Sequence, residues 1–337
     1  MKRCTSCGSD LVFVPELHSL RCASCSNTQK IDFLVYKGAK QSYSSIDEAN
    51  DMVYECECEG CGNSLSFTKS SITFQCPFCG KGAIIENFKY DIAATIPFMF
   101  GRDALEIYYK AWVKSKIFAP SAMKKVSFIE KFDGHYVPAY VFDMNTKTSY
   151  SGMYAITRTR SIGSGNNRRV QTYTEYKPFR GTRSDKVRNN MVMGGSFMPN
   201  PVLEQIEPYF YEKLEIYNPD FLQGYIVDNY TKNLNEGLNL SKNEIKLDIS
   251  NKIRRGSPHR VTSLDVNIVY NDIKFGRYLL PVYRCSMNYK GENYTFFVNG
   301  QTGKVYGNTP VSFWKVLFTV LSVILIIGLI VYLTIID

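Results

Sequence analysis

The chain has 337 residues, enough for two or three domains, and its 45% hydrophobic content is typical of a folded protein. The formal net charge is +9, but it is unevenly distributed: residues 1–90 carry nine basic and ten acidic residues, whereas residues 91–337 carry 31 and 21. Nucleic-acid binding depends on neutralising phosphates, so the N-terminal part is poorly suited to it.

Eight of the ten cysteines form two identical sets, and a single constant offset, that from Cys4 to Cys58, relates every member of one set to the other. Each set reads C-x2-C, fourteen residues, then C-x2-C, which is the ligand spacing of a four-thiolate zinc ribbon. Four thiolates leave no open position for water, so the sequence predicts two structural Zn²⁺ ions. A tetrahedral sulfur cage would also suit iron, as in a rubredoxin-like site. The predicted metal ligands are Cys4, Cys7, Cys22 and Cys25, and then Cys58, Cys61, Cys76 and Cys79.

These sets define a first ribbon over residues 1–36, a polar linker over 37–55 and a second ribbon over 56–90. Each ribbon is too small to fold on its own core, so the metal must supply much of its folding free energy. Cys56 could replace Cys58 as a ligand, but the exact repeat of the first set favours Cys58. Each C-x2-C pair is expected to form a tight turn, called a knuckle, and His18 lies between the two knuckles of the first ribbon. It is not expected to bind metal, because the second ribbon has Ile72 at the matching position.

Residues 91–310 are expected to form an α+β body. The apolar spacing predicts helices over 102–116, 203–217 and 228–255. Alternation predicts strands over 126–131, 136–144, 148–157, 171–176, 261–269, 278–289 and 294–298, with a hairpin turn at Asn299-Gly300. The stretch Pro138–Asn145 resembles Pro281–Asn288 without a gap, with four identities in eight positions. The body could therefore consist of two related halves, each a helix followed by an antiparallel meander.

A basic loop is expected over Arg158–Arg188, where arginines alternate with aromatic residues. Three interpretations stay open for it: a solvated excursion from a sheet, a contact with anionic lipid headgroups, or a grip on single-stranded nucleic acid. The chain has three histidines and none of the usual catalytic or nucleotide-binding motifs, so an enzyme is not expected.

The segment 316–336 contains 21 residues without a charge or a proline. As a helix it would be about 32 Å long, enough to cross a bilayer core of about 30 Å. Trp314 and Lys315 precede it, where aromatic and basic anchors belong. The sequence therefore predicts a single-pass, tail-anchored protein of the cell membrane. Cysteines that must stay reduced to hold metal place the N-terminal bulk in the cytoplasm.

The segments Gly134–Pro138 and Leu279–Tyr283, together with Tyr294–Ser312 and the knuckle Cys76–Gly80, resemble a bacterial family of TFIIB-type zinc-ribbon-containing membrane proteins. The resemblance covers nearly the whole chain, and Asn299–Lys304 is its most specific part. It implies membership of a membrane-stress module, with a phage-shock protein A homologue and an SPFH-type scaffold protein as partners. The two ribbons depart from the commoner single-ribbon pattern.

These observations predict a membrane-anchored cytoplasmic adaptor, which docks partner proteins through its ribbons. The alternative is a membrane-tethered nucleic-acid-binding protein.

Overall fold

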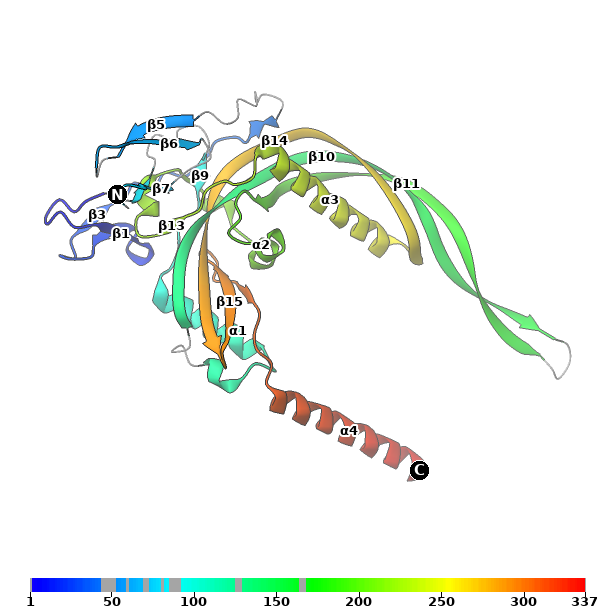
Figure 1. Cartoon of the computed structure of the whole chain (residues 1–337). Coiled ribbons are helices and arrows are strands. Elements are labelled where there is room, and N and C mark those ends of the chain that lie inside the picture. The colour runs from blue at the N-terminus through cyan, green and yellow to red at the C-terminus, as the bar shows by residue number, and fades with distance from the viewer. Residues whose placement is uncertain are drawn as a thin grey trace.

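The computed structural model of the chain describes residues 2–43, 53–58, 61–68, 73–79, 82–84, 92–124, 129–163 and 168–336. It confirms the predicted α+β class (Figure 1). The helices are α1 (Arg102–Ser115), α2 (Asn200–Ile206), α3 (Leu234–Gly256) and α4 (Phe313–Ile336). The N-terminal strands are β1 (Leu11–Val14), β2 (Ser19–Cys22), β3 (Thr28–Lys30), β4 (Gln41–Ser42), β5 (Val53–Glu57), β6 (Ser64–Thr68), β7 (Thr73–Gln75) and β8 (Gly82–Ile84). The later strands are β9 (Ala94–Thr95), β10 (Ile129–Ile162), β11 (Arg169–Met193), β12 (Glu215–Ile216), β13 (Ile226–Val227), β14 (Arg260–Tyr289), β15 (Glu292–Asn299) and β16 (Val305–Gly307).

One mixed sheet organises the body. The neighbours in its main order, β11-β10-β14-β15-β16, are antiparallel, and the short strands β9 and β13 add parallel pairs. The three strands expected between residues 126 and 157 are a single strand, β10, and the two expected between 261 and 289 are a single strand, β14. One of the three register shifts between β10 and β14, at Asp143/Asn145, lies at a predicted break between strands. A bulge adds one residue without ending the strand, so it interrupts the alternation that the prediction relied on.

The two faces of this sheet bury separate apolar cores. On β10, Tyr136, Tyr140 and Phe142 belong to the larger core, whereas Val137 and Val141 belong to the other. This is the two-residue period of a strand that is covered on both sides. Helices α1 and α3 lie over the first face, and α2 covers the second together with the segment around Tyr209.

The helix predicted over 203–217 is wrong beyond Ile206, where α2 ends. Pro208 follows, and a residue before proline is pushed out of the helical region of backbone space. Helix α3 begins later than predicted, because Asn233 forms a capping box with Glu236. Each of these side chains accepts a hydrogen bond from the other's backbone amide, which satisfies two amides of the first turn.

The body repeats one unit, β9–α1–β10–β11, as β13–α3–β14–β15. Strand β9 pairs in parallel with β14 at Tyr278, and β13 pairs in parallel with β10 at His135, the residue that corresponds to Tyr278 in the repeat. The backbone hydrogen bonds correspond as well. The Ile96 amide donates to Leu279 at 2.9 Å, and the Asp228 amide donates to Tyr136 at 3.0 Å. The fold therefore contains the two related halves, and each half supplies the short parallel strand that pairs with the other half.

A curved arm extends from the body, formed by β10, β11 and β14, with α3 beneath it (Figure 1). Pairing with β14 ends at Ala155↔Arg260, and beyond this point β10 and β11 continue as a two-stranded hairpin. The expectation of a basic loop over Arg158–Arg188 is therefore wrong, because nearly all of the described residues in this range are strand. Two of the arginines make ion pairs, Arg158 with Glu175 at 2.7 Å and Arg183 with Asp185 at 2.5 Å.

Candidate metal centres

The first cysteine set lies on two knuckles. Each knuckle turns back on itself through backbone hydrogen bonds: the Gly8 amide donates to Cys4 at 2.9 Å, and the Ser26 amide donates to Cys22 at 3.1 Å. Gly8 has a φ of 73°, in the left-handed region that glycine adopts without strain. The turns place Cys4 and Cys22 inside and leave the other two cysteines at the surface.

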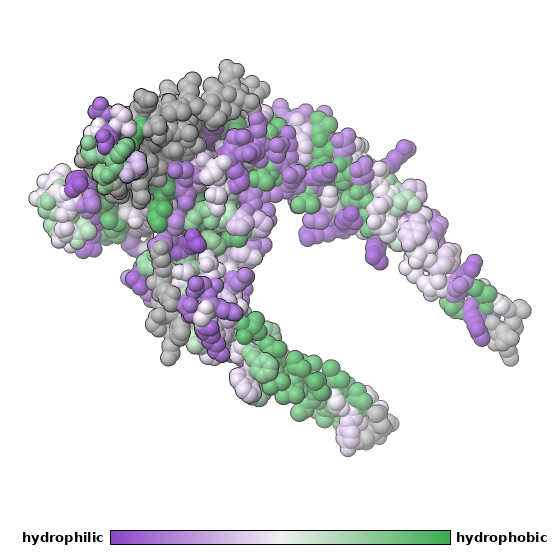
Figure 2. Space-filling view, in the orientation of Figure 1, coloured by the Kyte–Doolittle hydropathy of each residue, from purple (hydrophilic) through white to green (hydrophobic). Residues whose placement is uncertain are grey.

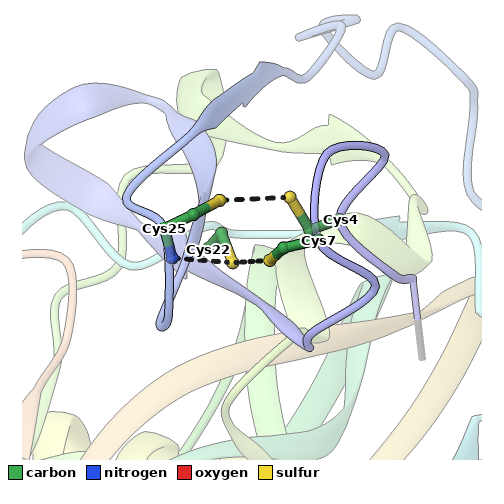
Figure 3. A group of neighbouring side chains, drawn as sticks. All are labelled: Cys4, Cys7, Cys22 and Cys25. Atoms are coloured by element: carbon green, nitrogen blue, oxygen red, sulfur yellow. Dashed lines mark hydrogen bonds between the residues drawn. The ribbon is translucent and has the colours of Figure 1, made fainter.

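The four sulfur atoms converge on one point between the knuckles (Figure 3). All lie within 4.8 Å of one another, with Cys4 Sγ and Cys25 Sγ 3.6 Å apart and Cys7 Sγ and Cys22 Sγ 3.4 Å apart. A tetrahedron of thiolates at about 2.3 Å from a metal has edges of about 3.8 Å. The arrangement thus fits a closed four-thiolate metal site.

The knuckle backbone favours thiolates. Mainly through a hydrogen bond from the Ser6 amide, the pKa of the Cys4 thiol falls to about 6. The Ser9 amide lowers the pKa of the Cys7 thiol in the same way. At Cys25, the lowering effect of the Asn27 amide is outweighed by the neighbouring sulfurs, and the pKa rises to about 12. Four thiolates could share this volume only with a cation between them, so the chemistry of the donor set also suits a metal.

The second set repeats this geometry. Cys58 Sγ and Cys79 Sγ are 3.7 Å apart, and Cys61 Sγ and Cys76 Sγ are 3.6 Å apart. The first cysteine faces the fourth and the second faces the third, as in the first set. Gly62 matches Gly8, with a φ of 72° and a 2.7 Å hydrogen bond to the Cys58 carbonyl. In the part of the chain that the structure describes, Cys58 is a member of the second group of four converging cysteines, as predicted. The side chain of Cys56, the alternative ligand, lies outside the described part of the chain.

The first ribbon packs into the body. Phe13 makes an edge-on contact with Phe221 at 5.5 Å, and Phe33 contacts the same ring at 5.1 Å. The Phe13 amide donates to the carbonyl of Gln223 at 2.9 Å, and Lys2 pairs with Asp220 at 2.6 Å. The buried residues of this ribbon therefore belong to the larger core of the body.

The second ribbon forms a separate small cluster in the described part of the chain, made of Cys58, Leu65 and Cys76. Its second knuckle carries Phe78, whose side chain is 66% exposed. The equivalent residue of the first ribbon is Ser24, also exposed but polar. Phe78 does not stand out from the cysteine spacing, but the two corresponding motifs, Cys-Ala-Ser-Cys and Cys-Pro-Phe-Cys, differ at its position.

The other candidate residues identified from the sequence do not belong to the two cysteine groups. His18 ends a short 3₁₀ turn with a φ of 47°, and its ring contacts Phe33 at 5.1 Å. His135 Nδ1 lies 3.0 Å from Asp228 Oδ2, a carboxylate oxygen that accepts the hydrogen bond. The Asn299–Lys304 segment is a hairpin turn, as predicted, in which the Gly303 amide donates to Asn299 at 2.9 Å.

At the other end of the chain, α4 is long and apolar enough to cross a membrane over Phe313–Thr334. None of its apolar window is buried in the structure. Figure 2 shows it as a continuous apolar rod that projects from the body. Among the side chains of α4 that the structure describes, only those of Lys315, Val316 and Leu317, near its start, are partly covered. A core helix would be buried along one face, so the exposure favours a membrane span over a buried helix.

Comparison with known proteins gives one relative. The chain is 29% identical to the uncharacterized protein YdjG of Bacillus subtilis (strain 168) over 319 residues, which cover 93% of this chain and 91% of the relative. No protein-family model and no solved structure matches the chain. The similarity therefore extends over most of the chain.

Proposed function

We propose that this protein is a membrane-anchored cytoplasmic adaptor whose zinc-loaded ribbons bind partner proteins at the membrane. Helix α4 is the anchor, and the eight cysteines hold two structural Zn²⁺ ions. A cytoplasmic location suits thiolates that must stay reduced. By the resemblance described above, the partners are an SPFH-type scaffold protein and a phage-shock protein A homologue, in a membrane-stress complex.

The exposed ring of Phe78 carries this proposal. The first ribbon is held in the body through Phe13, whereas the second forms its own small cluster and presents an aromatic residue at the tip of a metal-held knuckle. Exposed aromatic residues on rigid supports are typical centres of protein interfaces. The knuckle backbone is fixed by the metal, so binding would cost little conformational entropy. We therefore assign partner binding to the second ribbon and a structural role to the first.

Charge supports protein rather than nucleic-acid binding by this half. Residues 1–90 have a net charge of −1, and each four-thiolate zinc site would add −2. A surface of this sign repels phosphates. Closed sites also leave no metal position for a substrate, which agrees with a role other than catalysis.

The test uses the full chain, tagged and purified in mild detergent, with the SPFH-type scaffold protein of the same bacterium as the probe. Phe78→Ser, which installs the residue of the first ribbon, should weaken capture at least tenfold, as expected for a central interface aromatic. Leu17→Ser is the matched control, because Leu17 is also exposed, at 52%, but lies in the first ribbon.

Both variants should keep the metal content of the wild type. Equal capture by Phe78→Ser and the wild type would contradict the assignment to the second ribbon. Salt-sensitive binding of DNA or RNA that is lost with either ribbon would instead favour the membrane-tethered nucleic-acid-binding alternative.

A further inference from the structure

Five large apolar side chains are exposed where α4 leaves the body. They come from two separate segments: the loop that follows α1, and the start of α4 with the residue Val311 shortly before it. We call them the interfacial patch: Ile117 (76% exposed), Phe118 (39%), Val311 (65%), Phe313 (69%) and Trp314 (65%). Such a contiguous set on one surface marks a contact that the isolated chain does not satisfy.

The two segments are joined by hydrogen bonds. The Ser312 amide donates to the Phe118 carbonyl at 2.8 Å, and Lys315 Nζ donates to the Ala119 carbonyl at 2.6 Å. Ala119, Pro120 and Pro310 are buried beneath them. The loop after α1 is therefore fixed against the base of α4, and its exposed side chains are held beside the point where that helix leaves the body.

This position corresponds to a defined depth in a bilayer. The carbonyl of Phe118 meets the chain at Ser312, about one helical turn before Val316. The uncharged segment that begins at Val316 is about as long as the hydrocarbon core is thick. The loop would thus lie just outside the hydrocarbon, in the headgroup layer, where tryptophan and other amphipathic rings concentrate.

The charges around the patch agree with a lipid surface. Lys110, Lys114 and Lys116 are exposed on α1 and the loop beside it. The ammonium group of Lys116 lies 5.5 Å from the centre of the Trp112 ring. An apolar tip with flanking lysines is the usual composition of a segment that lies in the interface of an anionic membrane.

We propose that the interfacial patch is a second membrane contact, which inserts into the headgroup layer of an anionic bilayer and fixes the orientation of the body on its surface. This inference rests on the membrane anchoring in the proposed function. Two contacts prevent free rotation of the body about α4, so the ribbons would be held at a constant height and direction relative to the membrane.

The test measures the depth of a single tryptophan in the full chain, reconstituted in vesicles of phosphatidylcholine and phosphatidylglycerol. Trp112→Phe and Trp314→Phe remove the two native indoles, and Ile117→Trp introduces one in the loop. Lipids brominated near the headgroup end of the acyl chain should quench its fluorescence at least twofold. Insertion into the apolar part of the interface should also place its emission to the blue of an indole in water.

Leu247→Trp in the same background is the matched control, because Leu247 is exposed to a similar degree, 66%, but lies on α3 under the arm. It should show no quenching. Alkaline carbonate extraction is done first: a protein that is extracted contradicts the anchor and with it the proposed function. A protein that resists extraction but gives no more quenching at position 117 than at 247 overturns only the interfacial patch. A blue-shifted indole that bromolipid does not quench would mean that a second protein copy covers the patch, and this too overturns the proposal.

Discussion

Tyr140 and Tyr283 occupy equivalent positions in the two halves of the body and make the same hydrogen bond. The hydroxyl of Tyr140 donates to the Lys232 carbonyl at 2.9 Å, and that of Tyr283 donates to the Phe100 carbonyl at 2.6 Å. Each acceptor lies two residues before the first residue of a helix, α3 in one case and α1 in the other. The two tyrosines hold matching places in the repeated segment, each two positions after its proline.

Each tyrosine thus holds the helix of the other half. Tyr140 on β10 is hydrogen-bonded to the segment that precedes α3, and Tyr283 on β14 to the segment that precedes α1. The ring of Phe296 on β15 likewise stacks on Tyr109 of α1 at 4.9 Å. Because α1 and α3 each contact strands of the opposite half, the two halves share the larger core and should unfold together.

Removing either hydroxyl should therefore lower the free energy of unfolding by a similar amount. Tyr140→Phe and Tyr283→Phe each leave a carbonyl without its donor, so each should lower the free energy of unfolding by about 1–2 kcal/mol. Urea denaturation of the full chain in detergent, followed by circular dichroism, measures this. Tyr176→Phe is the control, because Tyr176 is 60% exposed and its change should stay within about 0.5 kcal/mol. A large loss in only one of the two core variants would show that the halves are not coupled in this way.

The sequence was informative where local spacing decides the structure. Two residues between cysteines define a knuckle, and the match of the segment at Pro138 to that at Pro281 pointed to the two halves. Prediction failed where distant contacts decide. The strand β10 continues through the bulge at Asp143/Asn145 because β14 pairs with it on both sides. The packing of Phe13 on Phe221 also joins segments that are far apart in the sequence, which no local pattern reveals.

The two metal centres should contribute unequally to the stability of the body. Cys22→Ser and Cys76→Ser should each remove one of two metal equivalents. Since Cys22 belongs to the larger core and Cys76 to the separate cluster, only Cys22→Ser should lower the main thermal transition by several degrees. Metal analysis and near-ultraviolet circular dichroism measure the two effects. Equal losses of stability would contradict the structural role given to the first ribbon.

The ligand set of the second ribbon has its own test. Cys58→Ser should reduce the metal content from two equivalents to one, whereas Cys56→Ser should leave it at two, because Cys58 Sγ lies 3.7 Å from Cys79 Sγ in the described group. Elemental analysis of chelator-free preparations also identifies the ion. Iron in place of zinc, or a lower content in Cys56→Ser, would contradict the assignment.

The groove between α2, α3 and β11 should make stability depend on pH. Burial raises the pKa of the Glu207 and Glu244 carboxyls to about 7 from an ordinary value of 4.5. A folded-state pKa above the unfolded value favours the protonated form, so the stabilisation is present below about pH 4.5 and is lost as pH rises through about 7.

The urea midpoint should therefore fall between about pH 5 and pH 8, and Glu207→Gln combined with Glu244→Gln should flatten this slope. Glutamine at position 244 can still accept the 2.9 Å hydrogen bond from Asn200 Nδ2. Glu212→Gln, at an exposed position, is the control and should keep the slope of the wild type. A double variant with an unchanged slope would show that other groups cause the pH dependence.

A charge in the middle of α4 should impair membrane insertion without disturbing the soluble part. Leu325 is 71% exposed and lies near the centre of the apolar segment, where an arginine costs about 2.5–3.5 kcal/mol. Leu325→Arg should increase the fraction of protein that alkaline carbonate extracts from membranes. Leu247→Arg, on the exposed surface of α3, should leave extraction unchanged.

Shortening the chain before Phe313 should release it into the soluble fraction, with both metal equivalents retained because the cysteine sets lie far from this end. An N-terminal tag on the intact chain should resist protease added outside bacterial protoplasts. Cleavage of the tag there would place the ribbons outside the cell, and complete retention of Leu325→Arg in the membrane would mean that something other than α4 anchors the protein.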